Sequence, residues 1–200
     1  MDRLSTEDYI THCWKLVEDY VKDIFYNKIL VNKYIKLVVK QYVENVNSGK
    51  WDYDVEKINK VFAFFSFLNI DYKDKYIQFP MMPFQAFFLV NVFGFYYLNS
   101  NKRKYREALL FIARKNGKTA FSAAIQLFGM LGDGVNVPQS LLLSNTAKQA
   151  SNALNYAKDI VNHTPALSKR LISLKSKIAY INRKRQGFCE IFKSQFVVSS

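Results

Sequence analysis

The sequence has few of the residues that mark secreted, metal-bound or disordered proteins. Its 200 residues include only two cysteines, seven glycines and four prolines, while half of the residues are hydrophobic. Cys13 and Cys189 lie far apart, and neither belongs to a C-x-x-C pair, so a disulfide framework and a structural zinc site are not expected. We therefore expect a globular, core-forming chain in a reducing, cytoplasmic compartment, with both cysteines buried as small hydrophobic side chains.

Long apolar runs are also missing. Residues 1–14 are charged and have no apolar centre of the kind that a signal peptide requires. The most apolar stretch, residues 84–98, contains Gln85, Asn91 and Gly94 and is too short to span a bilayer. The sequence predicts a buried helix there and no membrane partner.

Acidic residues are scarce in one part of the chain. Residues 1–75 carry twelve Lys or Arg and twelve Asp or Glu, whereas residues 76–200 carry seventeen basic residues and four acidic ones. All of the net charge of +13 therefore lies in the second part. This asymmetry favours a polyanionic partner, and double-stranded DNA bound through its phosphates fits it. A solvated surface, or an interface with an acidic neighbouring subunit, is the alternative.

Amphipathic spacing predicts three helices in the first third of the chain, at residues 2–25, 32–46 and 54–68. They form a platform for which the sequence indicates no chemistry. Residues 71–83 are polar and end in Pro80 and Pro83, which is typical of a linker. We therefore expect an N-terminal helical region over residues 1–76 and a second domain over residues 77–200.

The most informative stretch is residues 107–133. Residues 108–113 form an apolar run typical of a strand buried on both faces, residues 114–119 form a polar turn that reads RKNGKT, and residues 120–131 return to helical spacing. A strand, a lysine-bearing turn and a helix together hold nucleotide phosphates in many proteins, because the helix N-terminus offers unpaired N–H groups and a positive dipole.

Two side chains of this turn have specific predicted roles. Lys118 would reach the β- and γ-phosphates of a nucleotide, and the Thr119 hydroxyl would ligate Mg²⁺. The Gly-Lys-Thr tripeptide alone is a weak signal, and the full loop pattern requires glycine at the position of Ile112. A solvated basic turn, capped by Asn116 or Thr119, is the alternative.

The remainder continues the alternation of strands and helices. Residues 140–143 predict a strand, and a helix follows from a cap at residues 144–146 to about His163, which would interact with the dipole at the helix end. Strand patterns recur at residues 177–181, 187–192 and 196–198, the first two as a hairpin. The predicted fold class is α/β, with a mostly parallel sheet and flanking helices after the N-terminal helical region.

Taken together, three motifs resemble the large terminase subunit of tailed bacteriophages. They are PFQAFFLVNVFGF at residues 83–95, REALLFIARKNGKTAFSAA at residues 106–124 and SLLLSNTAKQASNALNYAKDIV at residues 140–161. The resemblance covers roughly residue 80 to the end of the chain. The phosphate loop of that family reads Arg-Lys-Asn-Gly-Lys-Ser/Thr, so the missing early glycine matches the family pattern. The resemblance implies an ATP-driven motor that threads viral DNA into a capsid, built on an incomplete P-loop NTPase domain.

The resemblance also implies site residues and partners. ATP would be held by Arg114, Lys115, Asn116, Gly117, Lys118 and Thr119, with Mg²⁺ on Thr119 and the adenine on Gln85. Thr146 and Gln149 match family positions near the nucleotide or DNA, although capping explains Thr146 equally well. The implied partners are double-stranded DNA, the small terminase subunit, the portal protein and further copies in a homo-oligomeric ring. The implied location is the cytoplasm of a bacterial host.

One expected element is not found. An ATPase of this type needs an apolar strand that ends in Asp-Glu, which holds the water shell of Mg²⁺ and polarises the attacking water. After Lys118 the acidic residues are Asp133, Asp159 and Glu190, and none follows such a strand. We therefore assign no catalytic residue and expect nucleotide binding without efficient hydrolysis. The chain is interpreted as the front part of a larger protein whose nuclease domain lies further on.

Two other functional interpretations stay open. One is another P-loop enzyme, such as a helicase-like motor or a small kinase. The other is a non-enzymatic basic module for DNA binding or assembly, in which the lysine-bearing turn is incidental. Loss of nucleotide binding on removal of Lys118 would support the enzymatic interpretations and exclude the non-enzymatic module.

Overall fold

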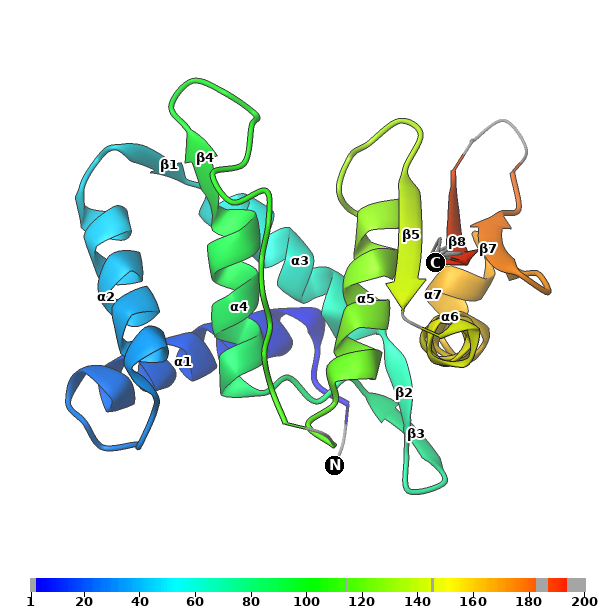
Figure 1. Cartoon of the computed structure of the whole chain (residues 1–200), viewed down its shortest axis with the longest axis horizontal. Coiled ribbons are helices and arrows are strands. Elements are labelled where there is room, and N and C mark those ends of the chain that lie inside the picture. The colour runs from blue at the N-terminus through cyan, green and yellow to red at the C-terminus, as the bar shows by residue number, and fades with distance from the viewer. Residues whose placement is uncertain (1–2, 114, 145, 183–186, 194–200) are drawn as a thin grey trace, which may run out of the picture. The chain divides into compact units, whose positions relative to one another are not determined.

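The computed structural model describes residues 3–113, 115–144, 146–182 and 187–193. Within these ranges the chain forms two compact units. The helical unit comprises residues 3–66 and 80–111, and the mixed unit comprises residues 67–79 and 112–193. Figure 1 labels the elements of both units.

The helical unit is built from helices whose starts follow from local hydrogen bonding. Side-chain oxygens of Ser5, Asn32 and Asp54 each accept from a backbone N–H three residues later, at 3.1, 3.0 and 2.9 Å. The three predicted N-terminal helices are therefore confirmed. The elements of this unit are α1 (Thr6–Phe25), α2 (Lys33–Asn47), β1 (Trp51–Tyr53), α3 (Val55–Phe67), α4 (Pro83–Gly94) and β4 (Phe95–Tyr97).

The apolar helix α4 provides much of the core of the helical unit. Its residues Ala86, Leu89 and Val90 are completely buried, and α1 packs along it. The predicted buried helix is confirmed, but it ends at Gly94, because the next three residues form β4 and pair in antiparallel fashion with β1. No sequence pattern indicates this ribbon, since each of its strands has only three residues.

The mixed unit contains a four-stranded sheet in the order β5-β8-β7-β6. Strand β5 pairs with β8 in parallel, and the other two pairings are antiparallel. The predicted strand at residues 140–143 and the predicted hairpin are confirmed, whereas residues 196–198 lie outside the described residues. The elements of this unit are β2 (Asn69–Tyr72), β3 (Lys75–Gln78), α5 (Lys118–Leu131), β5 (Gln139–Ser144), α6 (Ala147–His163), α7 (Pro165–Ser168), β6 (Leu171–Ser173), β7 (Lys177–Tyr180) and β8 (Phe188–Lys193).

Helices α5 and α6 pack against each other and against the sheet of the mixed unit. Phe121 and Leu127 of α5 and Leu154 of α6 are buried, together with Ala124 and Ala157. Strand β5 runs opposite to α5, so the carboxyl end of β5 points toward the end at which α5 begins (Figure 1). This is the local order expected of an α/β unit, although the sheet among the described residues is mixed rather than mostly parallel.

The prediction of a buried strand at residues 108–113 is wrong. None of the described strands pairs with this segment, which is extended without being part of a sheet. Leu109 and Phe111 are 90% and 94% exposed. An apolar run becomes a buried strand only where neighbouring strands satisfy its backbone groups and other elements cover its faces. Neither condition is met in the described structure.

Most of the predicted linker at residues 71–83 is a hairpin, formed by β2 and β3, that docks on α6. The Asn69 backbone N–H donates to Thr164 Oγ1 at 2.9 Å, and Tyr76 Oη donates to Asp159 Oδ1 at 2.9 Å. His163 stacks on the Tyr76 ring at 3.6 Å between ring centroids, with its Nδ1 3.0 Å from the Asp159 carbonyl oxygen. The linker prediction is therefore wrong for residues 71–78, while the division of domains between residues 76 and 77 stays a prediction.

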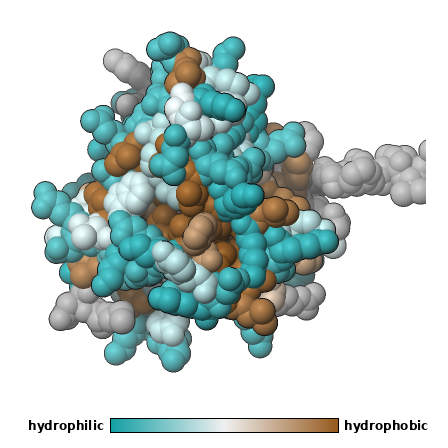
Figure 2. All heavy atoms as spheres, turned by 90° about the vertical axis from the view of Figure 1, so that its left-hand side faces the viewer, coloured by the Kyte–Doolittle hydropathy of each residue, from teal (hydrophilic) through white to brown (hydrophobic). Residues whose placement is uncertain are grey.

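Apolar side chains remain on the surface of the helical unit. Figure 2 shows a face on which they gather around a hollow near the middle, with hydrophilic side chains around them. Exposed large side chains also cluster at the connection between α1 and α2; they are Phe25, Tyr26, Leu30, Tyr34 and Leu37. Among the described residues, no helix combines the length and the hydropathy that a membrane span requires.

We predict that Thr164→Val destabilises the mixed unit by about 1–3 kcal/mol, because it removes the acceptor of the Asn69 N–H at a side chain that is fully buried. Urea unfolding followed by circular dichroism measures the change. Thr164→Ser is the matched control, because it keeps the hydroxyl and loses only a methyl group, about 0.8 kcal/mol. Equal destabilisation by both substitutions would contradict the role of the hydroxyl.

Candidate functional site

The turn before α5 has an unusual backbone. Lys115 and Gly117 both have φ of 69°, in the left-handed region, and they flank Asn116. The side-chain amide of Asn116 donates to the Ala113 carbonyl oxygen at 3.4 Å, across the turn. Alternation of left-handed residues with residues of negative φ makes successive N–H groups converge, which creates a concave site for an anion. Arg114 lies outside the described residues.

Helix α5 begins at Lys118, and Gly117 in its N-cap position provides no side-chain cap among the described residues. The Phe121 N–H donates to the Gly117 carbonyl oxygen at 3.0 Å, which is the first bond of the helix, so the N–H groups of residues 118–120 have no acceptor within it. Helices α1, α2 and α6 differ, because the side chains of Ser5, Asn32 and Thr146 cap them. The cap by Asn116 or Thr119 that the alternative interpretation expected is therefore not found among the described residues, while a solvated basic turn stays an alternative.

The side chains at this turn fit a phosphate group. Lys118 is exposed at the first position of α5, and Thr119 is half-buried at the second. Lys115 and Asn116 are exposed beside them. An ammonium group, a hydroxyl group and backbone donors that have no acceptor within the helix, at the positive end of a 14-residue helix, form a donor set that suits a polyphosphate with Mg²⁺.

A second helix begins at the carboxyl end of β5. The Thr146 hydroxyl accepts from the Gln149 N–H at 3.3 Å, so the predicted cap of α6 is confirmed. In α/β sheets, ligands bind outside the carboxyl ends of the strands, and α5 begins in the direction in which β5 points (Figure 1). A further role of Thr146 and Gln149 toward a nucleotide or DNA stays a prediction.

Gln85, the predicted adenine contact, lies in the helical unit. Its side chain is only 2% exposed, and its Oε1 accepts from the backbone N–H of Met82 at 3.0 Å. This bond caps the start of α4, whose Pro83 has no N–H to satisfy. Capping and packing thus account for its burial, and its role toward adenine stays a prediction.

The three acidic residues that follow Lys118 do not gather at the turn. Asp133 follows the far end of α5. Because each helical residue advances the chain by about 1.5 Å, the 14 residues of α5 place this end about 20 Å from Lys118. Asp159 lies on α6 and accepts from Tyr76. Glu190 lies within β8, in register with Leu141 and Lys177. The three acids therefore lie on different elements, with Asp133 far from the turn and Asp159 engaged by the β2–β3 hairpin.

The family model of the terminase large subunit, ATPase domain, matches residues 83–187. The chain belongs to the terminase large subunit family. The resemblance inferred from the motifs is thereby confirmed, and the matched range includes Gln85 and the whole turn at residues 114–119 of this terminase chain.

A solved structure agrees with the family model. The terminase chain is similar to the large terminase of bacteriophage HK97, with 26% sequence identity and a TM-score of 0.53 over 70% of this chain and 28% of the HK97 chain. The terminase chain therefore spans little more than a quarter of the length of that relative. A search of curated proteins found no match.

Sequence reasoning located the turn but not its conformation. The left-handed backbone of Lys115 has no signal in the sequence, because a lysine rarely adopts it. The start of α5 was predicted at residue 120, two residues late, because Lys118 and Thr119 interrupt the apolar spacing. Gly117 carried the missing signal, since glycine accepts a left-handed conformation at little cost.

We predict that Gly117→Val loosens the first turn of α5, because a side chain in the left-handed region costs about 1–2 kcal/mol. Amide hydrogen exchange of Phe121 should accelerate by roughly 5–30-fold. Gly134, with φ of 78° in the turn after α5, supplies the matched control. Gly134→Val should leave exchange at Phe121 unchanged, and equal acceleration by both substitutions would contradict a local effect.

Proposed function

We propose that this chain is the part of an ATP-driven DNA-packaging motor that binds the triphosphate of the nucleotide. The uncapped N-terminus of α5, with the Lys-Asn-Gly-Lys-Thr turn in front of it, carries the proposal. Support comes from the family to which the chain belongs, since the turn lies within the matched residues. The missing strand at residues 108–113 removes one expected support but leaves these donors unchanged.

Each residue of the turn has a role that its chemistry suits. The Lys118 ammonium would contact the β- and γ-phosphates, and the Thr119 hydroxyl would join the Mg²⁺ shell. Gly117 would let phosphate oxygens approach the first-turn N–H groups, because it has no side chain there. Arg114 and Lys115 would add positive charge, and Gln85 would hydrogen-bond the adenine edge. Hydrolysis of bound ATP supplies the free energy for DNA movement in a motor of this kind.

Double-stranded DNA is the proposed cargo. The excess of basic residues after residue 75 supports this partner, because DNA phosphates are bound through Lys and Arg without base readout. In the described mixed unit, Lys169, Arg170 and Lys175 are exposed. The small terminase subunit, the portal protein and a ring of further copies are proposed as partners through membership of the family. The bacterial host cytoplasm is the proposed setting.

We predict that Lys118→Ala weakens binding of Mg-ATP by about tenfold or more, because a charge-assisted hydrogen bond contributes about 1.5–3 kcal/mol. Fluorescence titration with a mant-labelled ATP measures the change. Lys169→Ala is the matched control: an exposed lysine at the end of α7, outside the turn. If Lys118→Ala binds as the wild type does, the turn is incidental, and a non-enzymatic DNA-binding or assembly module replaces the proposal.

We also predict that the isolated chain turns over ATP far more slowly than about 1 s⁻¹, the lower end for competent enzymes. The reason is that none of Asp133, Asp159 and Glu190 belongs to an apolar strand that ends in Asp-Glu, the element that would polarise the attacking water. A coupled assay of phosphate release, with Lys118→Ala as background, measures the rate. Turnover near 1 s⁻¹ that disappears in this variant would overturn the prediction and reveal an acid that the sequence pattern does not identify.

A further inference from the structure

A hollow in the helical unit has a lining that differs in chemistry from the turn before α5. Its volume is about 420 Å³, within the range of small ligand sites. All of its lining residues precede residue 83, so it lies outside the part matched by the family model. The hollow is lined by Trp14, Val17, Glu18, Val21 and Lys22 of α1, Tyr42 of α2, Tyr53 of β1 and Val55 of α3.

Three aromatic rings of the lining are held in place by the core behind them. Trp14 packs edge-on against Phe62, with its Nε1–H donating to Asn59 Oδ1 at 2.7 Å. Tyr42 and Tyr53 both pack against Phe95, at 6.0 and 4.8 Å between ring centroids. The rings are thus fixed before any ligand arrives, which reduces the entropic cost of binding.

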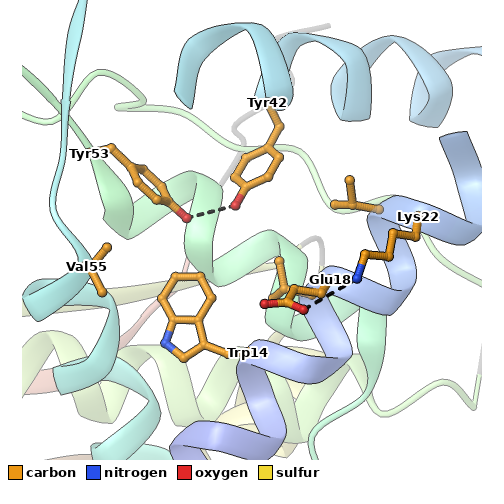
Figure 3. A pocket seen from close by; sticks show the side chains of 8 residues that line it. Trp14, Glu18, Lys22, Tyr42, Tyr53 and Val55 are labelled. Carbon is orange, nitrogen blue, oxygen red and sulfur yellow. Dashed lines mark hydrogen bonds and ion pairs between the residues drawn. The ribbon is translucent and has the colours of Figure 1, made fainter. Parts of the chain in front are cut away.

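The aromatic lining carries no charge of its own. The hydroxyls of Tyr42 and Tyr53 hydrogen-bond to each other at 2.8 Å. Burial raises the pKa of both tyrosines above the usual value, so both stay neutral over the physiological range. Glu18 is the acidic residue of the lining, and its carboxylate lies beside Trp14 on the side of Lys22 (Figure 3).

The present partner of Glu18 is replaceable. Lys22 lies one turn further along α1, with its Nζ 3.6 Å from Glu18 Oε2, and both side chains are more than 60% exposed. Such an exposed pair contributes little stability, so another cation can take the place of Lys22 at small cost. An anion would meet neutral rings and Glu18, and it would have to compete with this carboxylate for Lys22, the cation of the lining, which disfavours it.

We propose that this hollow binds an organic cation with an aliphatic stem, an alkylguanidinium or alkylammonium group. The stem would lie against Val17, Val21 and Val55, and the charged head would lie among the rings and beside Glu18. Aromatic rings attract cations through their quadrupoles, and a carboxylate adds a charge-assisted hydrogen bond. The same chemistry is offered by an arginine or lysine side chain of a protein partner and by a free small cation. The inference does not depend on the proposed nucleotide site.

The test is a titration of the full chain with n-butylguanidinium chloride, followed by the indole N–H signals in ¹⁵N NMR. We expect saturable shifts at Trp14, with a Kd on the order of 1 mM, and none at Trp51, which is not part of the lining. The neutral analogue N-butylacetamide and the anion pentanoate should bind at least about fivefold more weakly. Equal binding of the neutral analogue would overturn the proposal.

Variants at exposed positions sharpen the test without risk to the fold. Glu18→Gln should weaken binding of butylguanidinium at least about fivefold, and Lys22→Gln should tighten it about twofold, because Lys22 competes for the carboxylate. Glu44→Gln is the matched control, because Glu44 forms a similar exposed ion pair with Lys40, with 3.8 Å between the charged atoms. This pair is not part of the lining. An unchanged Kd in Glu18→Gln, or an equal change in Glu44→Gln, would overturn the proposal.

A second arm distinguishes the two sources of the cation. A blocked Gly-Arg-Gly peptide is titrated in parallel with butylguanidinium. Tighter binding of the peptide supports an arginine side chain of a protein partner as the occupant, because peptide groups then add contacts around the mouth. Equal or weaker binding supports a free small cation. Absence of saturable shifts with both probes overturns the proposal.

Discussion

Much of this structure depends on how α5 begins. The helix starts at a left-handed glycine without a side-chain cap among the described residues, so its first N–H groups have no acceptor within the helix. Unpaired donors of this kind are unfavourable unless water or a ligand meets them, so the helix has to be stabilised elsewhere. Phe121 and Leu127, buried against α6 and the sheet, supply that stabilisation, at about 1.5–3 kcal/mol for each large side chain. The packing therefore maintains a donor site that the turn alone would not sustain.

The scarcity of acidic residues after residue 75 has two consequences that follow from the same fact. It leaves an excess of positive charge, which favours a polyanion, and it leaves few carboxylates for catalysis. The structure shows how one of them is used, because Asp159 accepts from Tyr76 where the β2–β3 hairpin docks on α6, while Glu190 lies within strand β8. Binding of phosphates and activation of water are separate tasks, and the described residues suit only the first.

The sequence predicted what is decided locally and missed what is decided at a distance. Ser5, Asn32 and Thr146 mark helix starts through their own side chains, so those helices were predicted correctly. Residues 108–113 have the composition of a buried strand, but a strand also needs partners, which no local pattern specifies. Residues 71–78 of the β2–β3 hairpin were predicted as part of a linker because the docking of the hairpin on α6 depends on Thr164 and Asp159, more than 80 residues away. The family motif located the site, whereas its backbone conformation required coordinates.

Because sequence patterns do not specify contacts between distant elements, no sequence motif indicates the aromatic hollow. Trp14, Tyr42 and Tyr53 come from three elements, and each alone is typical of a core residue. What distinguishes them is that packing against Phe62 and Phe95 leaves one side of each ring facing a hollow that also contains Glu18. Its charge preference is opposite to that of the turn before α5, where lysines and helix N–H groups favour anions. In the hollow a phosphate would meet Glu18 and neutral rings, with Lys22 already paired to Glu18, and at the turn an organic cation would meet exposed lysines. The Mg²⁺ proposed for Thr119 would arrive together with the nucleotide. The two sites can therefore act on different ligands in one solution without competing.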